Sequence, residues 1–243
     1  MEKEWFEDWF DTSYYHILYQ NRNDDEARRF IHHLIDHLNL PKGAKVLDLA
    51  CGKGRHSITL NELGYDVLGV DLSPNSIETA SKHSNEQLSF KVHDMRERIQ
   101  DHKFAAIFNL FTSFGYFTNE RDNLAVLISA NEMLEENGLL LIDFMNVKKV
   151  IQEMTSKETK TLNGIEFQIS KYCDMQHIFK EIKFEDEGSD FHFTERVQIL
   201  PFNKFEVLLQ QADFKILRTF GDFNLSAFDE NTSDRLIILA QKN

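Results

Sequence analysis

The segment that most constrains the fold is a short apolar strand that runs directly into a glycine-containing turn and then a helix. We expect the strand at residues 45–50, the turn at 51–54 and the helix at 55–63. Strands alternating with helices along a chain predict parallel strands joined by right-handed crossovers, and therefore a doubly wound α/β sheet with helices on both faces. Further strands are expected at residues 66–71, 88–93, 104–110, 139–144, 214–220 and 235–240.

The alternation is interrupted after Met145, where residues 151–200 carry β-rich stretches with no helix between them. We expect this segment to be an antiparallel β insertion, acting either as a lid or as a dimer contact, so that both a monomer and a homodimer remain open. Residues 1–150 and 201–243 would then form the main domain. The β-rich stretches lie at residues 164–172, 177–184 and 191–200.

The N-terminal residues 5–20 are rich in aromatic side chains with mixed helical spacing. One interpretation is a helix that buttresses the sheet, because aromatic stripes usually belong to a core. The other is a lid that closes over a bound ligand and excludes water. The sequence leaves both open.

The composition disfavours several classes of partner. The formal net charge is −13, from 27 Lys and Arg against 40 Asp and Glu, which repels nucleic acid and anionic membrane surfaces. No apolar stretch approaches the roughly 20 residues of a membrane span. The two cysteines form no paired framework or metal motif, so we expect a cytoplasmic protein without a bound metal.

Small and acidic residues fall where successive strands of such a sheet end, which is where open α/β sheets bind ligands. Gly52 and Gly54 would let the backbone approach a ligand closely. Asp71 could accept hydrogen bonds from both hydroxyls of a ribose, and Asp94 from an adenine amino group. Ser57 stands where a dinucleotide-binding motif has its third glycine, which disfavours an NAD-dependent oxidoreductase.

These residues carry a resemblance to a known family. Residues 46–54 (VLDLACGKG) resemble motif I of class I S-adenosylmethionine-dependent methyltransferases, 70–73 (VDLS) the acidic ribose motif, and 93–95 (HDM) the adenine motif. Residues 108–117 (FNLFTSFGYF) are similar to the segment after strand four in bacterial small-molecule members. The resemblance implies a Rossmann-like, seven-stranded, mostly parallel sheet whose last strand is antiparallel. His56 departs from motif I, which usually has a third glycine there.

The resemblance also implies S-adenosylmethionine as cofactor and a set of contacts to it. Its methionyl part would lie near Asp48, Ala50, Gly52 and Gly54, its ribose near Asp71 and Leu72, its adenine near Asp94 and Met95, and its methyl group near Asn109 and Leu110. We expect the substrate pocket to include Tyr14, Tyr19, Phe111, Phe114 and Tyr116. No catalytic residue is assigned, because in-line methyl transfer needs alignment rather than a covalent nucleophile or a metal.

The sequence therefore predicts methyl transfer from S-adenosylmethionine to a nitrogen or oxygen atom of an unidentified small molecule. It lacks the Asn/Asp-Pro-Pro-Tyr tetrad that methyltransferases use for exocyclic amines of bases or for glutamine, and has Asn109-Leu-Phe-Thr112 instead. Two alternatives stay open at this point. One is a non-catalytic scaffold or sensor that retains cofactor binding, and the less favoured one is an NAD-dependent oxidoreductase.

Overall fold

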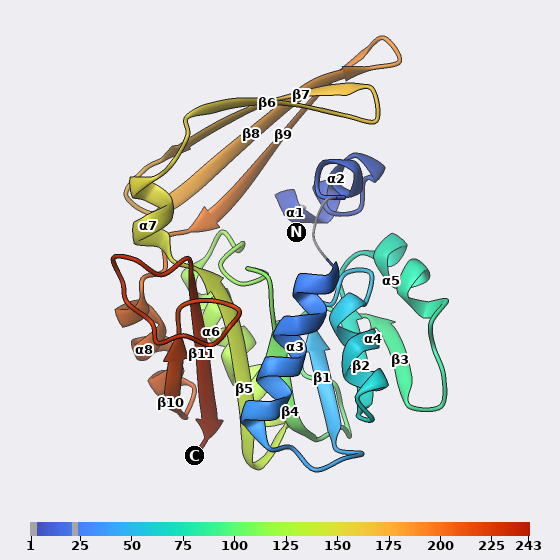
Figure 1. Ribbon diagram of the computed structural model, residues 1–243, viewed down its shortest axis with the longest axis vertical. Coiled ribbons are helices and arrows are strands. Elements are labelled where there is room, and N and C mark those ends of the chain that lie inside the picture. Colours follow the sequence, from blue (N-terminus) through green and yellow to red (C-terminus); the bar gives the residue numbers. More distant parts are fainter. Residues whose placement is uncertain (1–3, 21–23) are drawn as a thin grey trace.

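The computed structural model describes residues 4–20 and 24–243 and is built on a seven-stranded sheet (Figure 1). β11 is antiparallel to both of its neighbours, and the other neighbouring strands of this sheet pair in parallel. This confirms the predicted fold class. In spatial order the strands are β10 (Phe214–Phe220), β11 (Arg235–Lys242), β5 (Leu134–Met145), β4 (Phe104–Asn109), β1 (Lys45–Leu49), β2 (Asp66–Asp71) and β3 (Leu88–Val92).

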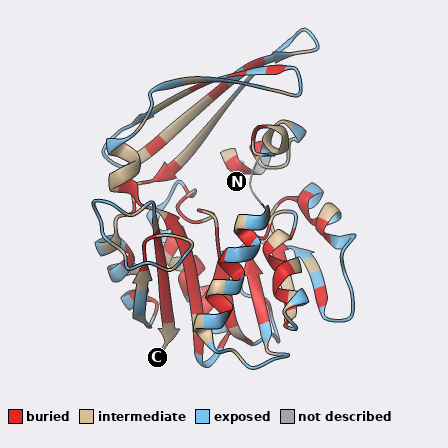
Figure 2. Cartoon of the chain, viewed as in Figure 1, coloured by how far each residue is buried: buried red, intermediate tan, exposed pale blue. Residues whose placement is uncertain are grey.

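Helices cover both faces of this sheet because successive strand residues point to opposite sides. Val46 packs in the hydrophobic core beneath α3 (Asp24–Leu38) and α4 (Arg55–Glu62), whereas its neighbour Leu47 packs in the core beneath the helices of the other face. Both cores are buried along the length of the sheet (Figure 2). The helices of the other face are α6 (Glu120–Met133) and α8 (Phe202–Gln211), and α5 (Pro74–Ser81) follows β2.

A second, four-stranded antiparallel sheet lies beyond the carboxyl ends of the parallel strands (Figure 1). It follows α7 (Val147–Gln152) and falls within the segment predicted as an insertion. β6 was not predicted as a strand, because it lies at the sheet edge, is largely exposed and has only Leu162 as an apolar residue. The strands are β6 (Lys157–Leu162), β7 (Ile165–Cys173), β8 (His177–Asp186) and β9 (Ser189–Gln198).

Two short N-terminal helices, α1 (Trp5–Trp9) and α2 (Ser13–Leu18), lie between the two sheets (Figure 1). Thr12 separates them and caps α2 by accepting the Tyr15 N–H at 3.1 Å, which explains the mixed helical spacing. Their buried residues Trp9 and Leu18 share a small core with the inner face of the second sheet, where Phe167, Ile182 and Phe184 are buried. Residues 1–3 and 21–23 of the predicted main domain lie outside the described residues.

No helix within residues 4–20 and 24–243 is both long enough and apolar enough to cross a membrane.

Candidate active site

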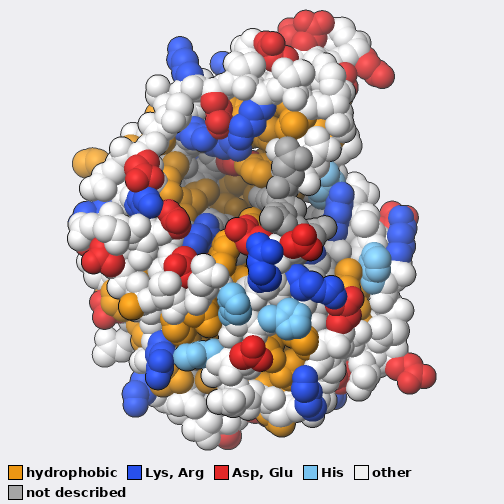
Figure 3. All heavy atoms as spheres, viewed as in Figure 1, with side chains coloured by type: hydrophobic (Ala, Val, Ile, Leu, Met, Phe, Trp, Pro, Cys, Tyr) orange, Lys and Arg blue, Asp and Glu red, His pale blue; other side chains and the backbone are white. Residues whose placement is uncertain are grey.

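A cavity of about 640 Å³ opens at the carboxyl ends of β1 to β4, roofed by the N-terminal helices. On the face drawn in Figure 3 the molecule is hollowed between the two sheets, and hydrophobic side chains line the hollow. The predicted site residues that line the cavity are Tyr19, Ala50, Gly52, Asp71, Leu72, Asp94, Met95, Leu110, Phe111 and Tyr116. Those that do not line it are Tyr14, Asp48, Gly54, Asn109 and Phe114.

The turn after β1 is held to Asp71 by its backbone. One carboxylate oxygen of Asp71 accepts the Gly52 N–H at 2.8 Å, and the other accepts the Ser73 N–H at 2.9 Å. Gly52 has φ +55°, and a Cβ built on it would meet no atom within 4 Å, so the backbone leaves open space where it borders the cavity. Burial is the main cause that raises the pKa of Asp71, and the backbone N–H groups of Ser73, Gly52 and Leu72 oppose it.

Asp48 and Gly54 support this turn from beneath rather than bordering the cavity. The fully buried Asp48 accepts a hydrogen bond from the Ser57 hydroxyl at 2.5 Å. Burial raises the pKa of Asp48 to about 6, although the Ser57 hydroxyl lowers it. Gly54 has φ +82°, and its Cα faces the ring of Phe90 so closely that a Cβ would lie 2.7 Å from Cε1.

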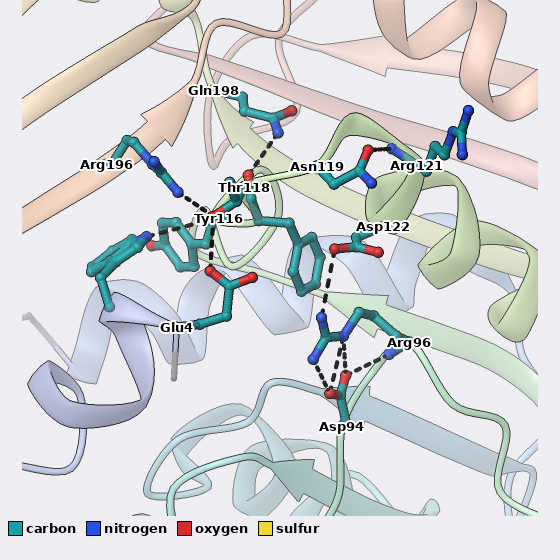
Figure 4. Close-up of polar contacts among 12 residues, drawn as sticks. Glu4, Asp94, Arg96, Tyr116, Thr118, Asn119, Arg121, Asp122, Arg196 and Gln198 are labelled. Atoms are coloured by element: carbon teal, nitrogen blue, oxygen red, sulfur yellow. Dashed lines mark hydrogen bonds and ion pairs between the residues drawn. The ribbon is translucent and has the colours of Figure 1, made fainter. Parts of the chain in front are cut away.

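Asp94 borders the cavity but is engaged by Arg96, a residue that the sequence analysis did not single out (Figure 4). Both Asp94 oxygens accept from the Arg96 side chain at 2.5–3.0 Å, and one also accepts the Arg96 backbone N–H at 2.9 Å. Arg96 also pairs with Asp122 at 3.6 Å and lies over the Phe117 ring at 5.0 Å. Burial alone would raise the pKa of Asp94, but the hydrogen bonds and charge of Arg96 lower it overall.

The structure does not bring Tyr14 or Phe114 to the cavity. Phe114 is fully buried, with its ring 5.5 Å from that of Phe205, because the chain after β4 turns this side chain into the core while Phe111 and Tyr116 border the cavity. Tyr14 packs its ring against the second sheet and donates its hydroxyl to Asp186 at 2.9 Å. Both residues therefore support the walls instead of forming the pocket surface.

Asn109 lies buried at the end of β4 and does not border the cavity. Its amide donates to the Leu49 carbonyl at 3.0 Å and so joins the ends of β4 and β1. Its Oδ1 atom is buried and accepts no hydrogen bond from the described residues. The Asn109 side chain thus carries acceptor capacity next to Met95, whose sulfur is 3.8 Å from the amide nitrogen.

The chain after β4 is held in an uncommon conformation at the cavity wall. Phe111 and Thr112 have φ values of +65° and +58°. The buried Asp143 accepts the Phe111 N–H at 2.9 Å and pairs with Arg235 at 2.8 Å, while Arg235 also donates to the Thr112 hydroxyl at 2.9 Å. Arg55, whose position at the start of α4 drew no prediction, lies 4.0 Å from the centre of the Phe111 ring and also lines the cavity.

Polar contacts attach the roof to the second sheet. Glu195 of β9 accepts the indole N–H of Trp9 at 2.8 Å and the hydroxyl of Tyr19 at 2.7 Å. Lys180 of β8 in turn donates to the Tyr19 hydroxyl at 2.5 Å, and burial is the main cause that lowers the pKa of Lys180. Tyr19 was predicted as a pocket residue from the sequence, but its two charged partners, which come from the distant insertion, were not.

A further set of contacts joins the roof to the chain after β4 (Figure 4). The Trp5 indole donates to the Tyr116 carbonyl at 3.1 Å, and the Thr118 hydroxyl donates to Glu4 at 2.9 Å. Arg196 of β9 reaches the same Thr118 hydroxyl at 2.5 Å. The roof is therefore held over the cavity by contacts to two distant parts of the chain, the segment after β4 and β9. Among the residues that the structure describes, no group of three His, Cys, Asp or Glu side chains is arranged to hold a metal ion.

Comparisons with known proteins identify the family of this chain. Residues 40–190 match the family model described as "Methyltransferase domain". A glycine/sarcosine N-methyltransferase from Aphanothece halophytica is 30% identical over 237 residues, covering 93% of this chain and 85% of that protein. Its counterpart from Parasynechococcus marenigrum (strain WH8102) is 32% identical over 232 residues, covering 91% and 79%. The crystal structure of an S-adenosylmethionine-dependent methyltransferase from Clostridium acetobutylicum shares the fold, with a TM-score of 0.80 at 18% identity, covering 95% of this chain and 96% of that one.

Proposed function

The chain belongs to the methyltransferase domain family and is a class I S-adenosylmethionine-dependent methyltransferase; from that premise we propose that it methylates a nitrogen or oxygen atom of a small molecule held in the roofed cavity. Membership of this family is the reason to set aside the oxidoreductase and the non-catalytic scaffold. The observation that carries the proposal is the roofed cavity, which has polar groups of the strand ends on one side and aromatic side chains on the other.

The residues present fit the cofactor. Each oxygen of Asp71 accepts one hydrogen bond from the backbone of Gly52 or Ser73, which leaves acceptor capacity for the two hydroxyls of a ribose. The open space at Gly52 suits the close approach of a methionyl chain. Leu72 and Met95 add apolar surface beside these polar groups. We therefore assign the ribose to Asp71 and Leu72 and the adenine to the neighbourhood of Asp94 and Met95.

In the reaction, the residues of this chain bind and align the cofactor and the acceptor, and they exclude water. When bound, S-adenosylmethionine supplies a methyl group on a positively charged sulfur. Phe111 and Tyr116 form a wall of the same cavity, and aromatic faces suit a positively charged or apolar group. The roof helices shield the site, and orientation alone contributes effective molarities of about 10⁵–10⁸ M in well-aligned systems. The Asp143–Arg235 pair fixes the backbone of this wall in place.

We infer a small acceptor from the size of the cavity and from the roof that covers it. A volume of about 640 Å³ falls in the usual range of small-molecule sites, roughly 300–1,000 Å³, and it must hold the cofactor as well. The net charge of −13 opposes a nucleic acid. The relatives named glycine/sarcosine N-methyltransferases support nitrogen as the first acceptor atom to test. We place the protein in the cytoplasm, where its free Cys51 and Cys173 would stay reduced.

The test is to incubate the protein with methyl-labelled S-adenosylmethionine and, in separate reactions, total RNA, a denatured protein extract and a low-molecular-weight metabolite fraction. We expect label to enter only the metabolite fraction, and Asp71→Asn to reduce its rate. Glycine, sarcosine and a panel of simple primary and secondary amines follow as pure acceptors. Efficient transfer to RNA or protein would contradict a small-molecule acceptor.

A further inference from the structure

A continuous chain of hydrogen bonds runs from the roof to the glycine turn. Asp11, in the turn between α1 and α2, accepts the hydroxyl proton of Ser73 at 2.5 Å, 62 residues further along the chain. The Ser73 backbone N–H is bound by Asp71 at 2.9 Å, and Asp71 in turn binds the Gly52 N–H at 2.8 Å. The roof is thereby connected to the carboxylate that we assign to the ribose, through one intervening residue.

Asn75 provides further hydrogen bonds to Asp11. Its side-chain amide donates to the Asp11 carboxylate at 2.8 Å and to the Asp11 carbonyl at 3.1 Å, and its backbone N–H donates to the carboxylate at 3.1 Å. With the Ser73 hydroxyl, these donors surround the carboxylate of Asp11 on the side of α5. A carboxylate with several hydrogen bonds from a fixed helix start is held in one position.

Ser73 links this contact to the conformation of the ribose-binding loop. Its hydroxyl oxygen also accepts the Ser76 N–H at 3.0 Å and so caps α5. The same residue therefore orders the start of α5, receives the roof through Asp11 and donates its backbone N–H to Asp71. A displacement of the roof at Asp11 would remove an acceptor from Ser73, one residue beyond the Asp71–Leu72 segment.

Electrostatics favours the same coupling. Burial is the main cause that raises the pKa of Asp71, and the nearby negative charge of Asp11 raises it further. Docking of the roof therefore brings two like charges together. Additional hydrogen-bond donors on Asp71, such as two ribose hydroxyls, stabilise its ionised form and offset this repulsion.

We propose that Asp11 is a positioning residue that couples closure of the roof to cofactor binding through Ser73 and Asp71. The inference rests on the proposed placement of the ribose at Asp71. Coupling of this kind is reciprocal: a docked roof strengthens cofactor binding, and bound cofactor strengthens docking of α1 and α2 to the same degree.

The test combines two measurements on the full chain, with S-adenosylhomocysteine as the probe. Calorimetric titration gives its affinity, and hydrogen exchange read by mass spectrometry reports opening of residues 5–18 with and without it. The variants are Asp11→Ala and Asn75→Ala, which remove the two sides of one contact, and their double variant. The matched control is Asp36→Ala, which removes an exposed carboxylate from α3 that does not border the cavity.

We expect Asp11→Ala to weaken binding about ten-fold, or ~1.4 kcal/mol. The probe should slow exchange in residues 5–18 of the parent and of Asp36→Ala, but much less in Asp11→Ala. Asn75→Ala should show both effects more weakly, and the double variant should resemble Asp11→Ala because both changes break one contact. If Asp11→Ala does not fold, Asn75→Ala carries the same two readouts.

Parent-like affinity together with parent-like protection of residues 5–18 in Asp11→Ala and Asn75→Ala would overturn the coupling. That result is distinguishable from failure of the proposed function. If the parent protein does not bind the probe, or if Asp71→Asn binds it equally well, the ribose placement itself is wrong.

Discussion

The two glycines of the turn after β1 offer a matched comparison, because a methyl group added to each meets different surroundings. In Gly54→Ala the new Cβ would lie 2.7 Å and 2.8 Å from ring atoms of Phe90 and 3.2 Å from the Cβ of Ala80, at φ +82°. The left-handed backbone costs roughly 1–2 kcal/mol for a residue with a side chain, and overpacking roughly 1–3 kcal/mol more. Gly54→Ala should therefore lower the free energy of unfolding by about 2–5 kcal/mol.

Gly52→Ala has the backbone cost without the clash, because no atom lies within 4 Å of its added Cβ at φ +55°. We expect a loss of about 1–2 kcal/mol in the free energy of unfolding. Since Gly52 borders the cavity, the methyl group added in Gly52→Ala should also weaken S-adenosylhomocysteine binding. This loss of affinity should exceed that of folded Gly54→Ala protein.

Urea denaturation of the two ligand-free variants and of the parent measures the difference, and calorimetric titration below the unfolding transition measures affinity. Replacing Phe90 by Leu in the Gly54→Ala background should recover part of the lost stability, because the nearest atoms belong to the Phe90 ring. If Gly54→Ala proves no less stable than Gly52→Ala, the packing of this turn against β3 is not as described.

Three further predictions follow from buried charged groups. Burial raises the pKa of Asp48 from 3.8 to about 6, so the folded state binds the carboxyl proton more tightly than the unfolded state does. The free energy of unfolding should therefore fall by ~3 kcal/mol as the pH rises from about 4 to 6. In Asp48→Asn, which can still accept from Ser57, urea denaturation across this range should show a decrease smaller by about this amount, because Asp71, whose pKa burial also raises, still contributes. Arg235→Ala should lower the free energy of unfolding by about 3–5 kcal/mol, because it leaves the charge of the buried Asp143 unpaired. Adding Asp143→Asn should restore part of this free energy in the same urea assay. Asp71→Asn should weaken S-adenosylhomocysteine binding about 10–100-fold in calorimetry, and it should also lower the free energy of unfolding by about 1–3 kcal/mol, because its NH₂ group cannot accept one of the two backbone N–H groups of Gly52 and Ser73. Equal affinity would exclude Asp71 from the site.

Strands and turns with a local signal could be predicted from the sequence. The apolar run of β1, the glycine turn and Asp71 at the end of β2 are all defined by neighbouring residues, and the structure places them together at one edge of the sheet. β6 could not be predicted in this way, since an exposed edge strand needs no apolar alternation and is specified by its pairing with β7.

The parts of the site that escaped prediction depend on contacts between distant segments. Arg96 engages Asp94 locally, yet nothing in its spacing marks it as different from a solvated surface arginine. Glu195 reaches Tyr19 across 176 residues, and Asp11 reaches Ser73 across 62. Phe114 and Phe111 belong to one aromatic run, and only the left-handed backbone at Phe111 and Thr112 decides which ring meets the cavity and which enters the core.

A crystal structure of the protein with S-adenosylhomocysteine would show directly where the ribose and the sulfur bind. We expect both ribose hydroxyls within hydrogen-bond distance, about 2.5–3.2 Å, of the Asp71 carboxylate, and the sulfur facing the Phe111 and Tyr116 wall beneath the N-terminal roof. A ribose bound away from Asp71, or a sulfur that faces away from this wall, would contradict this expectation.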